Sequence, residues 1–162
     1  MLRILVLGAA AGGGFPQWNS NNEASRRARA GDPLARPCSQ SSLAVSADGR
    51  RWVLLNASPD LRQQINDTPP LHPQEGVRHS PILAVVLTNG DVDHVAGLLT
   101  LRERQPLALY GSDRVLEVLA ENPIFKVLHP DYVARRPIAL NQAFEPRGRD
   151  GEASGLTIQP FL

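Results

Sequence analysis

Residues 81–87 read PILAVVL, and this unbroken apolar run constrains the fold more than any other segment. Its length and its β-branched side chains predict a strand, and the lack of any polar position predicts that this strand is buried. Shorter apolar runs at residues 3–7 and 107–110 predict further strands, and helix-like segments separate the later ones. Strands followed by alternating strands and helices predict an α/β domain built in layers.

Turn and capping signals refine this outline. An Asp-Gly pair predicts a hairpin between strands at residues 41–46 and 51–55. Ser58 is expected to cap a helix, because Pro59 suits the first helical position and Asp60 suits the positive end of the helix dipole. Further elements are expected as helices at residues 92–103 and 112–122 and as weaker strands at 137–140 and 156–159.

Composition narrows the classes of function. Seventeen Lys and Arg residues against 16 Asp and Glu residues give a net charge of +1, which gives no support for broad binding to nucleic acid or to anionic membranes. No apolar run approaches the roughly 18–20 residues that a membrane span needs. The single cysteine, Cys38, excludes an intramolecular disulfide, so we expect a cytoplasmic protein.

Two further segments leave their structure open. Residues 8–14 read GAAAGGG, which lacks the Lys-Ser/Thr pair of a phosphate-binding P-loop and does not fit the G-x-G-x-x-G pattern. A tight turn with close packing is therefore favoured there over a phosphate cradle. Residues 23–37 are polar and rich in arginine, and this pattern is compatible with either a short exposed helix or a flexible excursion.

The densest group of chemically useful side chains follows the predicted buried strand, in the sequence NGDVDH. Its Asp91, Asp93 and His94 lie at the carboxyl end of a strand, where ligands gather in open α/β sheets. Two carboxylates and an imidazole suit Fe(II), Mn(II) or Zn(II). The alternative is a helix start, in which Asp91 caps the helix, Asp93 meets its dipole and His94 is incidental. The residue types alone leave both interpretations open.

Four sequence blocks, taken together and in order, resemble one known family. They are GAAAGGGFPQWN at residues 8–19, QSS at 40–42, NASPDLR at 56–62, and DH at 93–94 followed by GLLTLRE at 97–103. The chain resembles the coenzyme PQQ synthesis protein B family over most of residues 2–145. The resemblance implies a metallo-β-lactamase-type αββα sandwich and a part in the biosynthesis of pyrroloquinoline quinone (PQQ).

The resemblance also implies a metal centre. The usual motif of the superfamily is His-x-His-x-Asp-His, and here Asn89 and Asp91 stand at the first two histidines, whereas Asp93 and His94 match. This implies that Asp91, Asp93 and His94 hold one Fe(II) or another divalent ion, rather than the pair of zinc ions of a hydrolase. The implied activity is iron-dependent hydroxylation of a tyrosine-derived PQQ precursor, with that precursor and other PQQ-biosynthesis proteins as partners. The alternative is a soluble carrier that helps to move PQQ or its precursor to the periplasm without catalysis.

Two departures from the family are expected to matter. Members often carry a Cys-x-Cys-x-x-Cys structural zinc cluster after the Trp-Asn pair, where this chain has Ser20, Asn22 and Ser25. None of these supplies a thiolate, so we predict no structural zinc there and a loop at residues 20–37 that is held less firmly, unless other contacts replace the metal. The chain is also short, so residues 1–162 are expected to form a single incomplete domain, the first half of the sandwich plus part of the second.

Overall fold

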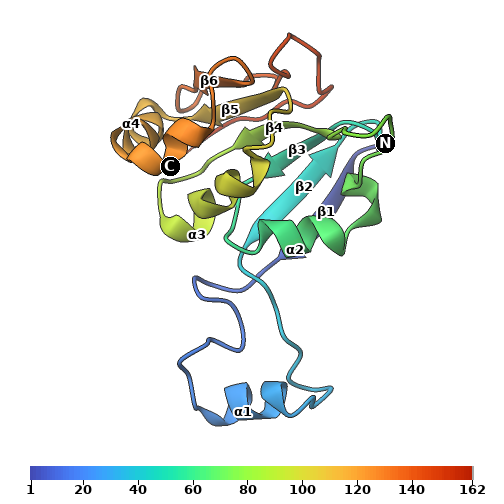
Figure 1. Cartoon of the computed structure of the whole chain (residues 1–162), viewed down its shortest axis with the longest axis vertical. Coiled ribbons are helices and arrows are strands. Elements are labelled where there is room, and N and C mark those ends of the chain that lie inside the picture. Colours follow the sequence, from blue (N-terminus) through green and yellow to red (C-terminus); the bar gives the residue numbers. More distant parts are fainter. Residues whose placement is uncertain (162) are drawn as a thin grey trace.

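The computed structural model describes residues 1–161, and Leu162, the last residue of the expected domain, lies outside this range. At its centre is a six-stranded sheet with the strand order β1-β2-β3-β4-β5-β6 (Figure 1). The pairs from β1 to β3 are antiparallel, and those from β3 to β6 are parallel. This mixed sheet with its helical connections confirms the predicted α/β class. The strands are Arg3–Gly8 (β1), Ser42–Ser46 (β2), Trp52–Leu55 (β3), Ile82–Val86 (β4), Leu107–Gly111 (β5) and Val133–Pro137 (β6).

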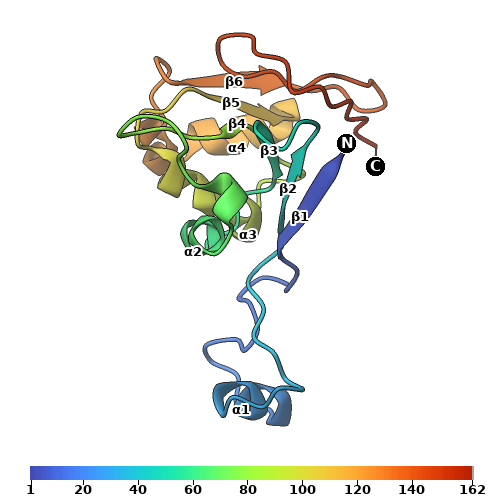
Figure 2. The ribbon, with the colours of Figure 1, turned by 90° about the vertical axis from the view of Figure 1, so that its right-hand side faces the viewer.

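Three helices cover one face of the sheet (Figure 2). Their side chains pack on alternate strand residues such as Trp52, Leu54 and Leu109, which are fully buried and form the larger core. No helix in the described part of the chain is long and apolar enough to cross a membrane. The helices are α2 (Leu61–Asn66), α3 (Val92–Val95) and α4 (Asp113–Glu121), accompanied by 3-10 helices at Pro69–Leu71, Ala96–Leu101 and Pro123–Val127.

The opposite face of the sheet carries a smaller core, which forms where residues of the C-terminal segment cover β3, β4 and β5. The apolar run at residues 81–87 is therefore buried from both sides, as its composition predicts. One face of β1 is open by contrast, since Ile4 and Val6 are 57% and 66% exposed. The buried residues of this smaller core are Val53, Ala84, Val86, Ala108, Tyr110 and Leu156.

Residues 11–38 leave the sheet as an arm, which carries helix α1 (Glu23–Arg29) at its tip (Figures 1 and 2). An isolated β-bridge between Phe15 and Cys38 joins the two sides of the arm near its base. At the tip, Asn22 Oδ1 accepts the backbone N–H of Ser25 at 2.7 Å and so caps α1. Of the two interpretations of this polar segment, the structure shows the short exposed helix.

The predicted start of helix α2 is wrong. The helix begins at Leu61, with Asp60 rather than Ser58 at its N-cap position. Ser58 instead closes a turn by accepting the N–H of Leu61 with its backbone oxygen, and its hydroxyl donates to Gln64 Oε1. The hydroxyl is therefore committed to a buried partner farther along the helix and is not available to cap the first turn.

Two other predicted elements also differ from the structure. The expected helix at residues 92–103 changes to a 3-10 helix at Ala96, because Gly97 donates its N–H to Ala57 outside the helix. The weak strand expected at 137–140 is in fact β6 at Val133–Pro137, where Arg135 and Arg136 occupy strand positions and hide the apolar pattern. The strand expected at 156–159 is reduced to an isolated bridge between residues 144 and 158.

Candidate metal centre

The loop after β4 makes a sharp turn before helix α3. Asn89 Oδ1 accepts the N–H of Asp91 at 3.0 Å, which closes a local turn by the side chain. Gly90 lies against α4, where a Cβ would meet Cγ1 of Val118 at 3.1 Å. The turn therefore places Asp91 beside the carboxyl end of a buried parallel strand, which is where open α/β sheets bind ligands.

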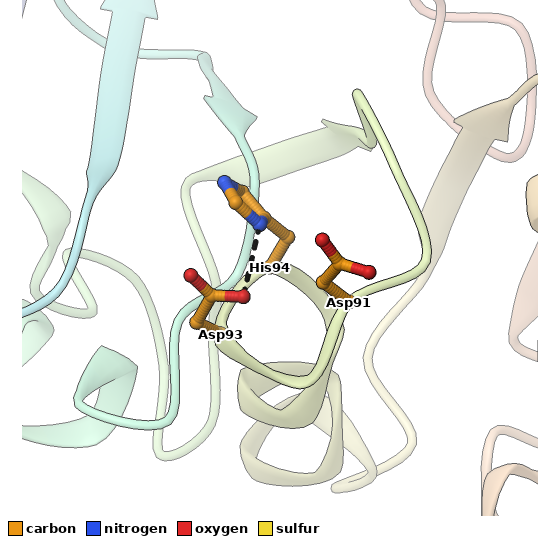
Figure 3. Close-up of side chains that lie close together, drawn as sticks. All are labelled: Asp91, Asp93 and His94. Carbon is orange, nitrogen blue, oxygen red and sulfur yellow. Dashed lines mark ion pairs between the residues drawn. The ribbon is translucent and has the colours of Figure 1, made fainter. Parts of the chain in front are cut away.

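Asp91, Asp93 and His94 come together around the first turn of α3 (Figure 3). Each offers one ligand atom, and these atoms lie within 4.8 Å of one another. His94 Nδ1 is 3.2 Å from Asp93 Oδ1. Asp93 and His94 are half-buried, whereas Asp91 is exposed. The structure thus assembles all three of the residues that the sequence singles out.

Two observations test whether this group fits a metal ion. Asp91 stands at the N-cap position of α3, but its side chain makes no capping hydrogen bond. His94 Nδ1 is buried, and within residues 1–161 it has no hydrogen-bond partner despite its proximity to Asp93. A buried polar atom without a partner costs free energy, which a bound cation would offset. The donor set therefore fits a divalent ion, and a helix start alone does not account for these side chains.

The backbone of α3 is held by the segment that follows β3. The N–H of Ala57 donates to the carbonyl of His94 at 2.8 Å, and the N–H of Gly97 donates to the carbonyl of Ala57 at 2.9 Å. The two segments approach so closely that a Cβ on Gly97 would lie 2.1 Å from the Ser58 carbonyl oxygen. Glycine is therefore required at residue 97, and the position of His94 depends on residues far away in the sequence.

Asn56 is a supporting residue that the sequence reasoning did not identify. Its Oδ1 accepts both the N–H and the hydroxyl of Thr88, at 2.9 and 3.1 Å, so it holds the loop that leads to the ligands. Its backbone has a φ of 63°, a left-handed conformation that asparagine adopts more readily than most residues. An asparagine directly after a predicted strand is the signal that could have indicated this role.

The glycine-rich segment at residues 8–14 packs beside the centre. Gly13 donates its N–H to Gln40 Oε1 at 2.9 Å, and Gly14 donates to the carbonyl of Ala11 at 3.0 Å. These N–H groups are therefore not available to a phosphate. Gly8 lies against the backbone, since a Cβ there would be 2.2 Å from the carbonyl oxygen of Gln40. The structure agrees with the tight turn rather than with the phosphate cradle.

The residues that stand at the family's cysteine positions lie in the arm and have other partners. Asn22 caps α1 through Ser25, whose side chain is buried. The carbonyl of Ser20 accepts a hydrogen bond from Arg29 Nη1 at 2.6 Å. The same guanidinium donates from Nη2 to the carbonyl of Gln17 at 2.7 Å. Contacts thus hold the segment for which the sequence left open either looser packing or a replacement of the metal.

A family model described as the beta-lactamase superfamily domain matches residues 51–161. The chain belongs to the β-lactamase superfamily. It is 58% identical over 161 residues to coenzyme PQQ synthesis protein B of Gluconacetobacter diazotrophicus, with 99% of this chain and 52% of that protein covered. It is 59% identical over 160 residues to the protein of that name in Methylorubrum extorquens strain AM1, with the same coverage of 99% and 52%. These relatives confirm the resemblance that the sequence blocks indicated.

Solved structures confirm the metallo-β-lactamase fold. Zn(2+)-bound PqqB from Methylobacterium extorquens superposes with a TM-score of 0.93 at 55% identity, covering 100% of this chain and 56% of that one. A diphosphatase from the PhnP family superposes with a TM-score of 0.67 at 26% identity, covering 90% of this chain and 54% of that one. The chain spans about half the length of the curated relatives it matches.

Proposed function

We propose that this superfamily member acts in PQQ biosynthesis and that Asp91, Asp93 and His94 hold a divalent metal ion for that role. The observation that carries the proposal is the three-donor group, in which the buried Nδ1 of His94 makes no hydrogen bond and faces the Asp93 carboxylate at 3.2 Å. The relatives named for PQQ synthesis support the pathway. The crystal structure of a zinc-bound relative supports a divalent metal.

Iron is the ion that we propose for the reaction. Two carboxylates and one imidazole provide oxygen and nitrogen donors of the kind that hold Fe(II). Bound Fe(II) would supply the redox chemistry for the oxygen-dependent hydroxylation of a tyrosine-derived PQQ precursor. The protein brings three donors together from one turn. The exposed Asp91 carboxylate faces solvent, so the ion would stay accessible on that side. A location in the cytoplasm and contacts with other PQQ-biosynthesis proteins stay predictions.

Genetic complementation tests the pathway and the site together. A strain that lacks the gene for this chain is expected to make no PQQ, and the wild-type gene is expected to restore it. The His94→Ala gene is expected not to restore PQQ, since it removes the buried donor nitrogen. Normal PQQ production without the gene would show that the biosynthetic role is wrong.

The carrier function is the other outcome of the same experiment. A carrier binds PQQ or its precursor through contacts that need neither metal nor oxygen. Restored PQQ production by His94→Ala, together with PQQ binding that a chelator does not weaken, would therefore replace the enzyme proposal with the carrier. Anaerobic equilibrium dialysis with and without chelator measures that binding directly.

A further inference from the structure

The glycine-rich loop lies beside Asp93, one of the proposed ligands. A Cβ built on Gly12 would lie 3.3 Å from Oδ2 of Asp93 and 3.6 Å from its Cγ, which is tighter than most side-chain contacts. Any side chain at residue 12 would therefore press on the carboxylate, and glycine leaves it clear. Residues 11–13 form a wall beside Asp93, although this wall and Asp93 come from distant parts of the chain.

Gln40 fixes this wall to the body of the molecule. Its Oε1 accepts the N–H of Gly13 at 2.9 Å. Its backbone forms a parallel β-bridge with Ala10, and the next residue, Ser41, donates its N–H to the Ala10 carbonyl at 3.0 Å. One residue therefore holds the loop both through its side chain and through its main chain.

Gln40 is itself oriented by polar side chains on and beside helix α2, of which those of Ser58 and Gln64 are buried. Asp60 Oδ2 accepts the backbone N–H of Gln40 at 2.8 Å and its side-chain Nε2–H at 3.1 Å. Gln64 Nε2 donates to the carbonyl of Gln40 at 2.8 Å, and Gln64 Oε1 accepts the hydroxyl of Ser58. Gln40, Ser58 and Gln64 are 8%, 0% and 3% exposed. The amide group of Gln40 is thus held at both its oxygen and its nitrogen.

A buried polar network of this kind gives a unique geometry only when its members are satisfied, and it is costly otherwise. Asp60 stands at the N-cap position of α2, yet its carboxylate makes no capping bond there. Both of its bonds go to Gln40 instead, so α2 forgoes the stabilisation that a side-chain cap supplies. At its other end, the network reaches the loop that confines Asp93.

We propose that Gln40, oriented by Asp60, is a positioning residue of the metal centre, because it holds residues 11–13 where they restrict the carboxylate of Asp93. The inference rests on the proposed function of Asp93 as a ligand. Groups that orient metal ligands without touching the metal typically change affinity by about 10- to 100-fold when they are replaced. Gln40 acts on Asp93 only through residues 11–13, so we expect its replacement to change affinity by the lower end of that range.

Co²⁺ titration of the chain, followed by calorimetry and by visible absorption, tests the proposal. Gln40→Met and Asp60→Ala are each expected to weaken Co²⁺ binding by about 10-fold and to shift the absorption bands, because Asp93 becomes free to rotate. Asp60→Asn keeps an oxygen acceptor for Gln40 and is expected to restore affinity and spectrum close to those of the wild type.

Asp48→Ala is the matched control. Asp48 Oδ1 accepts the N–H groups of Arg50 and Arg51 in the hairpin turn, away from the metal centre. Its loss is expected to lower the midpoint of thermal unfolding without changing Co²⁺ affinity or spectrum. The control separates a local effect on the metal centre from a general loss of stability.

Unchanged Co²⁺ affinity and spectrum in folded Gln40→Met and Asp60→Ala would overturn the positioning role. If circular dichroism shows that these variants do not fold, Gly12→Val decides, since it crowds Asp93 directly and leaves the network intact; unchanged binding by it would overturn the proposal as well. His94→Ala distinguishes an error in the ligand assignment from an error in the role of Gln40. If His94→Ala binds Co²⁺ like the wild type, the ligand assignment itself is wrong. If it alone loses binding, only the role of Gln40 is wrong.

Discussion

The arm at residues 11–38 and the loop at residues 88–97 both leave the sheet, but they differ in whether their polar groups have hydrogen-bond partners. In the arm, Asn22 and the carbonyl of Ser20 are paired with hydrogen-bond donors from the arm itself. In the loop, His94 Nδ1 is buried without a hydrogen-bond partner among the described residues, and the Asp91 side chain leaves its capping position unused. What separates the candidate metal centre from the arm is that three ligand atoms lie within 4.8 Å of one another, one of them a buried nitrogen that makes no hydrogen bond.

Arg29 explains how the arm keeps its shape. Its guanidinium donates to the carbonyls of Ser20, Gln17 and Trp18 at 2.6, 2.7 and 3.4 Å. A guanidinium presents five N–H donors in a rigid plane, so one side chain can gather several carbonyl oxygens. A structural zinc ion holds a loop by binding its cysteine side chains, whereas Arg29 holds this loop by bonding its backbone carbonyls.

The largest effect is expected from His94→Ala in the loop. We predict that the wild-type chain binds Fe(II) with a dissociation constant of micromolar or poorer, roughly −8 kcal/mol or less favourable, because all three donors come from one short turn. His94→Ala is expected to abolish this binding in an anaerobic calorimetric titration. His129→Ala is the control, since His129 also lies beside an aspartate, 3.4 Å from Asp131, but on the surface. Nanomolar affinity, or equal binding by His94→Ala, would mean that the metal centre is wrongly placed.

The next largest effect is expected on stability, when a glycine in the loop or in the arm is replaced by alanine. Gly97→Ala is expected to lower the free energy of unfolding by about 3 kcal/mol, since its Cβ would overlap the Ser58 carbonyl oxygen in a packed contact. Gly31→Ala in the arm meets nothing within 4 Å and is strained only by its φ of +76°. Its expected cost is about 1 kcal/mol. Urea unfolding of both variants measures the difference, and equal costs would show that the backbone contact at residue 97 relaxes freely.

Arg29→Ala is expected to loosen the part of the arm around α1 and to leave residues 11–13 and the metal centre unchanged. The guanidinium is exposed, so losing its bonds to Ser20 and Gln17 is expected to cost about 1 kcal/mol locally. This corresponds to roughly fivefold faster hydrogen exchange at the arm amides. Arg36→Ala removes a single bond of 3.3 Å to the Pro33 carbonyl and is the control. Weaker Co²⁺ binding by Arg29→Ala would show that loosening around α1 reaches residues 11–13 at the base of the arm, which lie beside Asp93.

Much of the sheet could be predicted because its signals are local. The apolar run at residues 81–87 and the Asp-Gly turn predict β4 and the hairpin of β2 and β3, and all three strands form there. The edge strand β6 could not be predicted from alternation, because Arg135 and Arg136 use their side chains to bond Phe125 and Tyr110. Polar residues on such a strand hide the pattern that an apolar strand shows.

The candidate metal centre could be predicted only in its ligands. Asp91, Asp93 and His94 lie close together in the sequence, so their spacing suggests the group that the structure assembles. The supports come from elsewhere: Gly12 lies beside Asp93, and Gln40 holds the loop that carries Gly12. Such contacts depend on the completed fold and leave no periodic or local pattern in the sequence.

The smallest expected effect is the response of the arm to acid. Asp32 accepts hydrogen bonds from Arg27 Nε at 2.6 Å and from the N–H of Leu34 at 2.9 Å. The bond from Arg27 is the main cause that lowers the pKa of Asp32 below its ordinary value of 3.8. A carboxyl group with a lowered pKa in the folded state stabilises that state above its ordinary pKa, and the contribution fades as the pH falls through the lowered value.

The arm amides of the wild type are therefore expected to exchange faster as the pH is lowered from about 5 to about 3, after correction for intrinsic exchange. Asp32→Asn keeps an oxygen for the Leu34 N–H but cannot titrate, so its arm is expected to show no such pH dependence. The amides of α3 serve as the internal reference, because Asp32 makes its bonds within the arm. The same acid response in Asp32→Asn and in the wild type would assign the effect to another carboxylate. If the amides of α3 also exchange faster in acid, the arm and the loop open as one unit and are not independent.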